Sequence, residues 1–208
     1  MTADLFFGFL QWLALVFIFT VHNYIKAITV IRMGDDTPRR FGFDTLNPLP
    51  HIDPIGTVVL PLAFILLKSP LVIGWPRPVP VDYSRFRSVK RAVVLIAAVS
   101  ILSYFFIGAV AYALYKTLFL FPLPETVVFP LSALFQFTVI ISVFFGFLNL
   151  IPIPPMEMGY IVFSLMGKDV WEIHRYALFG SLIILLLFVS GVLAYLFKPI
   201  YVFLLTLL

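Results

Sequence analysis

The chain has 208 residues, of which 62% are hydrophobic and 12% are charged, whereas an average soluble domain carries about 25% charged residues. This composition excludes a soluble globular protein and makes the lipid bilayer the solvent of most of the chain. The absence of cysteine excludes disulfides, thiolate metal ligands and a cysteine nucleophile. The net charge of +4 comes from basic residues scattered over short loops, which argues against a nucleic-acid partner and favours a role in membrane topology.

Five apolar stretches predict an all-α integral membrane protein with about five transmembrane helices. The first stretch lacks a basic leader and a small-residue cleavage site, so we interpret it as a retained helix rather than a signal peptide. The second is interrupted by Lys68 and Pro70 and is expected to be short or kinked. The third and fourth are long enough to cross about 30 Å of hydrocarbon. The predicted spans cover residues 5–33, 55–75, 92–115, 126–156 and 176–197.

The segments outside these spans complete the predicted architecture. The dipeptide 198–199 interrupts the last apolar stretch, and residues 200–208 are too short to span a membrane at about 1.5 Å per residue, so we expect a short re-entrant or interfacial tail. The loops 34–54 and 74–91 are rich in proline and mixed charge and are expected to be extended or hairpin-like. Since no internal repeat or low-complexity linker is present, residues 1–208 are predicted to form one membrane domain.

The basic residues of the loops indicate an orientation if the five spans alternate in direction. Seven Lys and Arg residues then lie on one side and five on the other, and this small excess favours a cytoplasmic N-terminus. The seven are Arg77, Arg85, Arg87, Lys90, Arg91, Lys168 and Arg175, and the five are Arg32, Arg39, Arg40, Lys116 and Lys198.

A few polar residues lie within the apolar stretches, where ionisable groups are costly and by default mark a function or a paired structural role. His22, Asn23 and Lys26 lie near the end of the first span, and His22 and Lys26 share one helix face because they are four residues apart. In the fourth span, Asn149 precedes a proline-rich segment that cannot continue as a regular helix, and Glu157 follows it. Such irregular backbone at membrane depth is tolerated only where it is buried in protein or lines a wet cavity.

Several segments resemble the bacterial site-2 proteases, a family of intramembrane zinc metalloproteases. Asn47 and His51 lie in the segment that resembles the one after the family's metal-binding helix, and Asn149 and Pro154 lie in the segment that resembles the approach to its third metal ligand. The resemblance implies a compact helical domain in the bacterial inner membrane, with cleavage of transmembrane segments as the ancestral activity. The matching segments are residues 34–37, 45–57, 74–81, 86–87 and 149–155.

The catalytic positions depart from the family's pattern. The family carries H-E-x-x-H on its first core helix, with two His ligands and a Glu as general base, and the corresponding window here runs from His22 to Lys26. Asn23 has no basic lone pair at the general-base position, and a protonated Lys26 offers no lone pair at the second ligand position. The family's third ligand, an Asp, corresponds to Glu157, which could still bind a metal. The family's later A-G-P-x-x-N segment aligns with residues 99–104, which puts Tyr104 at the Asn position.

These departures predict a catalytically degenerate homologue that has lost its zinc and its general base, and so is not an active enzyme. If the family's fold is kept, Lys26 and Glu157 converge where the zinc would lie, and we hypothesise an ion pair between them with His22 and Asn23 as hydrogen-bonding neighbours. The alternative for Lys26 is that it extends to the membrane interface beside Arg32. A cleft shaped for a transmembrane helix can still bind one, so the predicted partners are the lipid bilayer and the transmembrane helix of another membrane protein.

Two other functions stay open at this stage. An active intramembrane zinc metalloprotease would use His22, Glu157 and an unrecognised third ligand, for which His51 and His174 are the other histidines of the chain. A small transporter would use His22, Lys26 and Glu157 as a polar relay, but the lack of an inverted repeat argues against it.

Overall fold

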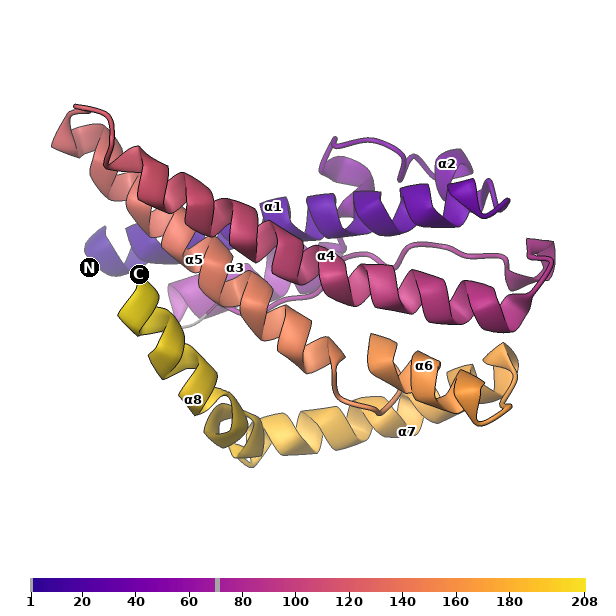
Figure 1. The fold of residues 1–208 in the computed structure, drawn as a ribbon. Helices are drawn as coiled ribbons and strands as arrows, with labels where there is room; N and C mark the ends of the chain where they lie inside the picture. The colour runs from indigo at the N-terminus through magenta and orange to yellow at the C-terminus, as the bar shows by residue number, and fades with distance from the viewer. Residues whose placement is uncertain (1, 70–71) are drawn as a thin grey trace.

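The computed structural model describes residues 2–69 and 72–208, which form helices joined by extended segments (Figure 1). No β-strand occurs within those two ranges. The elements are α1 (Thr2–Arg32), α2 (Thr37–Arg40), η1 (Leu49–His51), η2 (Pro54–Val59), α3 (Leu60–Leu66), η3 (Tyr83–Arg85), α4 (Val89–Leu118), α5 (Glu125–Asn149), α6 (Glu157–Leu165), α7 (Val170–Val189) and α8 (Val192–Leu207).

The core lies between the three long helices α1, α4 and α5. Ile18 and Phe19 of α1, Tyr104 of α4 and Ile141 of α5 pack together there and are buried. Lipid tails are as apolar as these side chains, so helix association in a membrane depends on close packing rather than on the hydrophobic effect. Gly146 of α5 shows how close the approach is, because a Cβ added there would lie 2.8 Å from the ring of Phe105 on α4.

Four helices are long and apolar enough to cross a membrane, in agreement with the predicted membrane protein. They are α1 from Asp4, α4, α5 and α7. The predicted span at residues 55–75 does not form one helix: the helical segment Pro54–Leu66 is about 20 Å long, against about 30 Å of hydrocarbon. Lys68 follows with a positive φ of 55°, and the chain from Val72 is extended. The expectation of a short or kinked segment is therefore confirmed, but the segment is not a single span over residues 55–75, because a hydropathy average does not distinguish a long helix from a short helix that turns back.

The C-terminal part also differs from the prediction of a span at residues 176–197 and a break at 198–199. The helix breaks earlier, at Gly191, whose φ of 77° favours glycine over other residues. Helix α8 then continues through Pro199 to Leu207. It packs on α5, where Leu204 and Val139 belong to one cluster. The re-entrant or interfacial placement of this tail stays a prediction.

An extended segment of residues 72–82, which we call the strap, runs along α1 (Figure 1). At one end the amide of Val72 donates to the side chain of Gln11 over 2.9 Å. In the middle the amide group of Asn23 donates to the carbonyl of Arg77 over 2.8 Å. The extended character predicted for the loop 74–91 is therefore confirmed over residues 74–82, where polar side chains of α1 hold the strap in place, whereas η3 and the start of α4 occupy the rest of that loop. The loop 34–54, also predicted to be extended or hairpin-like, contains the short helices α2 and η1.

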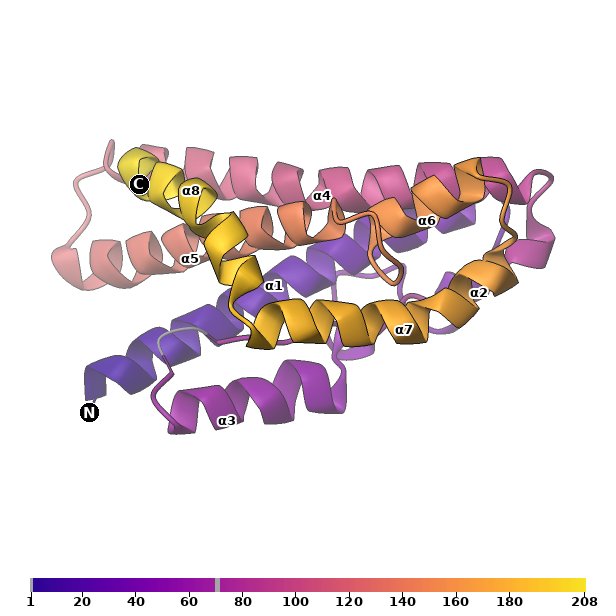
Figure 2. The same cartoon turned by 90° about the horizontal axis from the view of Figure 1, so that it is seen from below.

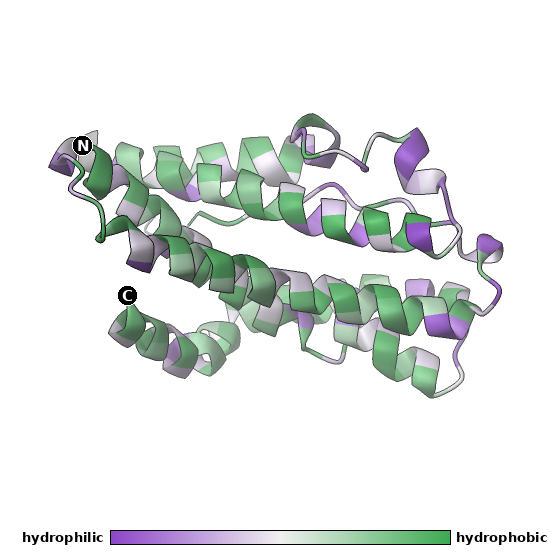
Figure 3. Cartoon of the chain, turned by 45° about the horizontal axis from the view of Figure 1, so that its top comes forward, coloured by the Kyte–Doolittle hydropathy of each residue, from purple (hydrophilic) through white to green (hydrophobic). Residues whose placement is uncertain are grey.

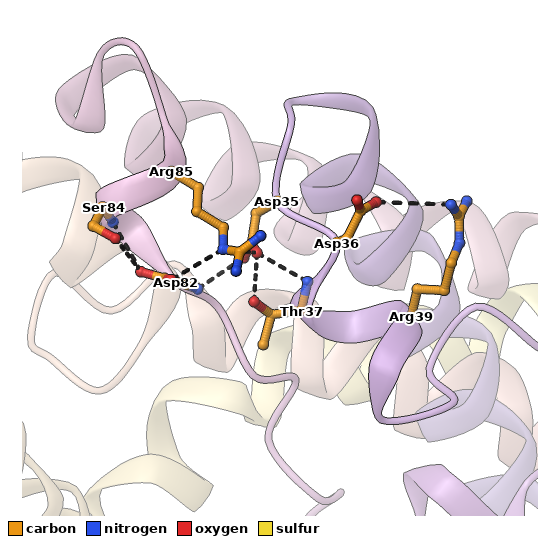
Figure 4. A network of polar contacts seen from close by, with 7 residues as sticks. All are labelled: Asp35, Asp36, Thr37, Arg39, Asp82, Ser84 and Arg85. Carbon is orange, nitrogen blue, oxygen red and sulfur yellow. Dashed lines mark hydrogen bonds and ion pairs between the residues drawn. The ribbon is translucent and has the colours of Figure 1, made fainter.

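The far end of the strap is fixed by Asp35, which follows α1 and is fully buried (Figure 4). Its carboxylate accepts hydrogen bonds from the backbone N–H and the hydroxyl of Thr37, at 2.9 and 2.5 Å, and from the backbone N–H of Asp82 at 2.7 Å. The guanidinium of Arg85 lies 3.5 Å away. A buried charge is tolerated when its lone pairs are satisfied in this way.

This contact shows that the loops 34–54 and 74–91 lie at the same end of the molecule. The tally of basic residues that assumed five alternating spans therefore fails, because the segment between these loops turns back. Hydrophilic residues gather at this end in Figure 3, around α2 and the start of α4. We call it the basic end, because nine of the 14 Lys and Arg residues lie there. They are Arg32, Arg39, Arg40, Arg85, Arg87, Lys90, Arg91, Lys168 and Arg175.

Candidate functional site

An ion pair joins the first and the sixth α-helix. The ammonium of Lys26, on α1, donates a hydrogen bond to Oε1 of Glu157, the first residue of α6. The two side chains are 19% and 12% exposed, so the pair is largely shielded from its surroundings. The structure therefore brings together two residues that are 131 positions apart in the sequence, as the ion-pair hypothesis expects.

The segment after α5 positions Glu157. Helix α5 ends at Asn149, whose amide group donates to the carbonyl of Phe145 over 2.9 Å, while its oxygen faces the backbone N–H of Glu157 at 3.4 Å. The proline turn between them fits tightly against α7, because a Cβ on Gly180 would lie 1.5 Å from the carbonyl oxygen of Pro154. Glycine is thus required at position 180, a constraint that the sequence analysis missed because it depends on tertiary contact.

His22 lies one turn before Lys26 and is held by α4. Its Nδ1 is 2.7 Å from the hydroxyl of Ser103, and that hydroxyl donates its proton to the carbonyl of Ser100. The hydroxyl must therefore accept from His22, which assigns the proton to Nδ1 and leaves the lone pair on Nε2. The imidazole stacks on the ring of Tyr104, with centroids 4.0 Å apart.

Asn23, which the resemblance to site-2 proteases predicts at the position of the general base, contacts the strap instead. Its side chain is buried, and its amide donates to the carbonyl of Arg77 over 2.8 Å. An amide has no basic lone pair with which to take a proton from water. The contact of this residue is thus structural, and it ties α1 to the strap beside the ion pair.

The other two predicted cleft residues make their contacts inside the loop 34–54. His51 is buried, donates from Nε2 to the carbonyl of Thr45 over 2.8 Å and meets the ring of Phe43 edge-on. Burial lowers the pKa of His51 below its ordinary value. Asn47 accepts the backbone N–H of Leu49 over 3.2 Å and thereby shapes an exposed turn.

Two tyrosines lie near the ion pair and were not selected from the sequence. Burial, with the nearby charge of Glu157, raises the pKa of Tyr83 above its ordinary value. The rings of Tyr83 and Tyr160 both contact His174, with centroids 6.2 and 5.6 Å away. Tyr83 comes from the extended loop 74–91, where no periodicity indicates which side chain turns inward.

The residues near the pair do not fit a zinc ion. Within the described ranges, no three His, Asp or Glu side chains come close enough together to hold a metal. Catalytic zinc takes three protein ligands and a water. Here the lone pair of His22 and the carboxylate of Glu157 are the available donors, and the carboxylate is engaged by Lys26.

The chain is similar to a protein of Bacillus subtilis (strain 168) that is named "Putative zinc metalloprotease YwhC". The two are 26% identical over 190 residues, which cover 90% of this chain and 83% of the relative. No known protein-family profile matches the chain. No solved structure matches it.

Proposed function

We propose that this chain is a site-2-protease-like membrane protein in which an ion pair takes the place of the metal centre, and that it holds the transmembrane helix of another membrane protein without cutting it. The observation that carries the proposal is the contact of Lys26 with Glu157. In the resemblance to the site-2 proteases, these residues stand at the positions of the second and the third metal ligand.

The chemistry of the pair supports the loss of proteolysis. The ammonium of Lys26 supplies a positive charge to Glu157, so the carboxylate needs no metal to be stabilised. A metalloprotease also needs a base that takes a proton from the attacking water, and Asn23 cannot do so. His22, Asn23 and Glu157 are all engaged in structural contacts. The site therefore holds helices together.

An apolar groove between α5 and α8 supports the binding of a hydrophobic segment. Its volume is about 570 Å³, and its lining is mostly apolar, with Ile140, Phe144, Tyr195 and Tyr201 among its residues and Lys198 as its charged member. We expect a photoreactive amino acid at Tyr201 to crosslink to the partner's transmembrane helix in membranes. The same probe at Leu102, which is exposed on α4 and lies outside this groove, is the matched control. Capture of lipid alone from position 201 would contradict helix binding.

The charge distribution supports a location in the cell membrane with the basic end facing the cytoplasm. Cytoplasmic loops carry the excess of Lys and Arg, and nine of the 14 such residues lie at this end. Because α1 ends there, the proposed orientation places the N-terminus outside, opposite to the orientation favoured by the simple tally. Accessibility of single cysteines introduced at Arg40 and Lys116 to a membrane-impermeant reagent measures it.

Elemental analysis of the protein, purified in mild detergent without metal-affinity capture, tests the loss of the metal centre. We expect zinc at background level both in the wild type and in Glu157→Ala. Near-stoichiometric zinc in the wild type that disappears in Glu157→Ala would overturn the proposal. The triple variant Asn23→Glu, Lys26→His, Glu157→Asp restores the family's donor set and serves as the positive control for metal detection.

One observation favours a second candidate, an active zinc metalloprotease: the name of the Bacillus subtilis relative. That function predicts chelator-sensitive cleavage of a transmembrane substrate by the wild type, and it requires a third ligand from outside the present contacts of His22 and Glu157. The polar-relay transporter predicts pH-dependent flux in liposomes.

A further inference from the structure

A polar hollow of about 360 Å³ opens at the basic end, and neither Lys26 nor Glu157 lines it. It lies where η3, the start of α4 and the turn between α6 and α7 meet. Its polar and interfacial lining includes Tyr83, Lys90, Ser164, Lys168, Asp169 and Trp171.

Ser164 is an unusual member of this lining. The residue is only 3% exposed, and no hydrogen bond to its hydroxyl is formed by the residues that the structure describes. Within the described residues, the fully buried side-chain atoms that lack a partner lie elsewhere, at His51, Ser100 and Ser142, so the hydroxyl of Ser164 is accessible from the hollow. An accessible hydroxyl pairs with water or with a ligand, and here it can pair with a donor or acceptor that enters the hollow.

The start of α4 adds backbone donors to the same wall. The residue before it, Ser88, makes no side-chain cap, so the first amide groups of α4 have no such partner, and Lys90 stands among them. The start of α7 is different, because Asp169 caps it by accepting the N–H of Glu172 over 2.8 Å. Uncapped amide groups and the helix dipole favour an anion at α4.

Two lysines give the hollow a positive character. Lys90 comes from α4, and Lys168 comes from the turn before α7, where its ammonium also lies 3.0 Å from Glu172. The carboxylate of Asp169, the acidic member of the lining, is occupied as the cap of α7. An oxyanion could thus meet two ammonium groups, backbone N–H groups and the hydroxyl of Ser164.

The rim of the hollow is apolar and faces outward. Trp171 is 76% exposed, and Leu165 and Met166 at the end of α6 are exposed beside it. Tryptophan next to lysine is typical of the membrane–water interface. A ligand with an anionic head and hydrocarbon chains matches both parts of this surface.

We propose that the hollow binds the phosphate headgroup of an anionic phospholipid, with its acyl chains along the exposed rim of α6 and α7. Basic pockets between transmembrane helices recognise such headgroups through the same combination of cations and hydroxyls. The hollow contains neither Lys26 nor Glu157, although Tyr83 lies near both sites, so the proposal does not depend on the function proposed for that pair.

Native mass spectrometry of the full chain in detergent, titrated with phosphatidylglycerol or phosphatidylcholine, tests this assignment. We expect the wild type to retain phosphatidylglycerol preferentially, and Lys90→Gln/Lys168→Gln to weaken its binding about tenfold or more, because hydrogen bonds to charged groups are lost. Ser164→Ala is expected to weaken it about threefold, the loss of one neutral hydrogen bond. Arg40→Gln, at the same end of the molecule but outside the hollow, is the matched control and should bind as the wild type does.

Three outcomes would overturn the proposal. The first is equal retention of the two lipids by the wild type, and the second is an equal loss in Arg40→Gln and in the double lysine variant. Both would indicate general surface attraction. The third is displacement of the lipid by inorganic phosphate at equal concentration, which would identify a free oxyanion as the ligand. Circular dichroism and size-exclusion profiles of the variants check that a loss of binding is not a loss of fold.

Discussion

Asp35 is fully buried and Glu157 is largely shielded, and the chain holds the two carboxylates in different ways. Asp35 accepts hydrogen bonds from the backbone of Thr37 and of Asp82, and a guanidinium covers it (Figure 4). The side chain of Glu157 is held by the single ammonium of Lys26. The backbone N–H groups that bind Asp35 are present whatever side chains their residues carry, whereas both partners of the Lys26–Glu157 pair are side chains that substitutions can replace together. The contact at Asp35 therefore depends on the conformation of the loops, and the contact at Glu157 depends on the identity of two side chains.

The largest effect is expected for Asp35→Ala. It would leave two backbone N–H groups and a hydroxyl without their acceptor in a buried place, and it would release the strap from the end of α1. We expect a loss of about 4 kcal/mol in the free energy of unfolding, measured by denaturant titration in detergent. Asp36→Ala, which removes an exposed partner of Arg39, is the control and should change little. Equal stability of the two variants would contradict the role assigned to Asp35.

The next largest effect is expected for Lys26→Ala. Glu157 would then lack its cation in a largely shielded place. Removal of one partner of such a pair is expected to lower the free energy of unfolding by about 3 kcal/mol. The double variant Lys26→Met/Glu157→Met removes both charges together and should regain most of this loss. If Lys26→Ala keeps the wild-type stability, the side chain does not act through the pair, and its extension to the interface becomes the better interpretation.

A smaller effect is expected for Asn23→Ala, which removes one hydrogen bond to the strap at Arg77. We expect a loss of about 1 kcal/mol in stability and faster hydrogen exchange of the backbone amides of the strap. Asn47→Ala removes a comparable bond in an exposed turn and should leave exchange in the strap unchanged. Unchanged exchange in both variants would show that Asn23 does not hold the strap.

The parts of the fold that could be predicted from sequence are those set by local composition. Helices α4 and α5 follow from long uncharged stretches, because a backbone in lipid must satisfy its own hydrogen bonds. The turn at Gly191 and the continuation through Pro199 could not be predicted, since each residue type is compatible with a break or a helix in a membrane. The return of the chain after α3 could not be predicted either, because the strap is held along α1 by tertiary contacts with Gln11 and Asn23.

The residues of the candidate site also fall into those that local sequence predicts and those that depend on tertiary packing. The spacing of His22 and Lys26 predicts a shared helix face from local geometry alone, whereas the approach of Glu157 required the resemblance to a known family. Ser103 and Tyr83 were missed because their roles arise from how α4 and the loop 74–91 pack against α1. Local patterns thus indicate which residues are unusual for a membrane, and tertiary packing decides which of them meet.

The smallest predicted effect is a pH dependence of the unfolding free energy that arises from His51 in the loop 34–54. Burial lowers the pKa of His51, so the unfolded chain binds a proton at higher pH than the folded chain does. Stability contributed by neutral His51 is therefore full above the ordinary pKa of about 6.5 and is lost as pH falls below it. In His51→Gln, the amide can still donate to the carbonyl of Thr45 but does not titrate. We expect the wild type to lose more unfolding free energy than this variant between about pH 7.5 and pH 5. Parallel stability curves over this window would show that the loop binds protonated and neutral His51 equally well.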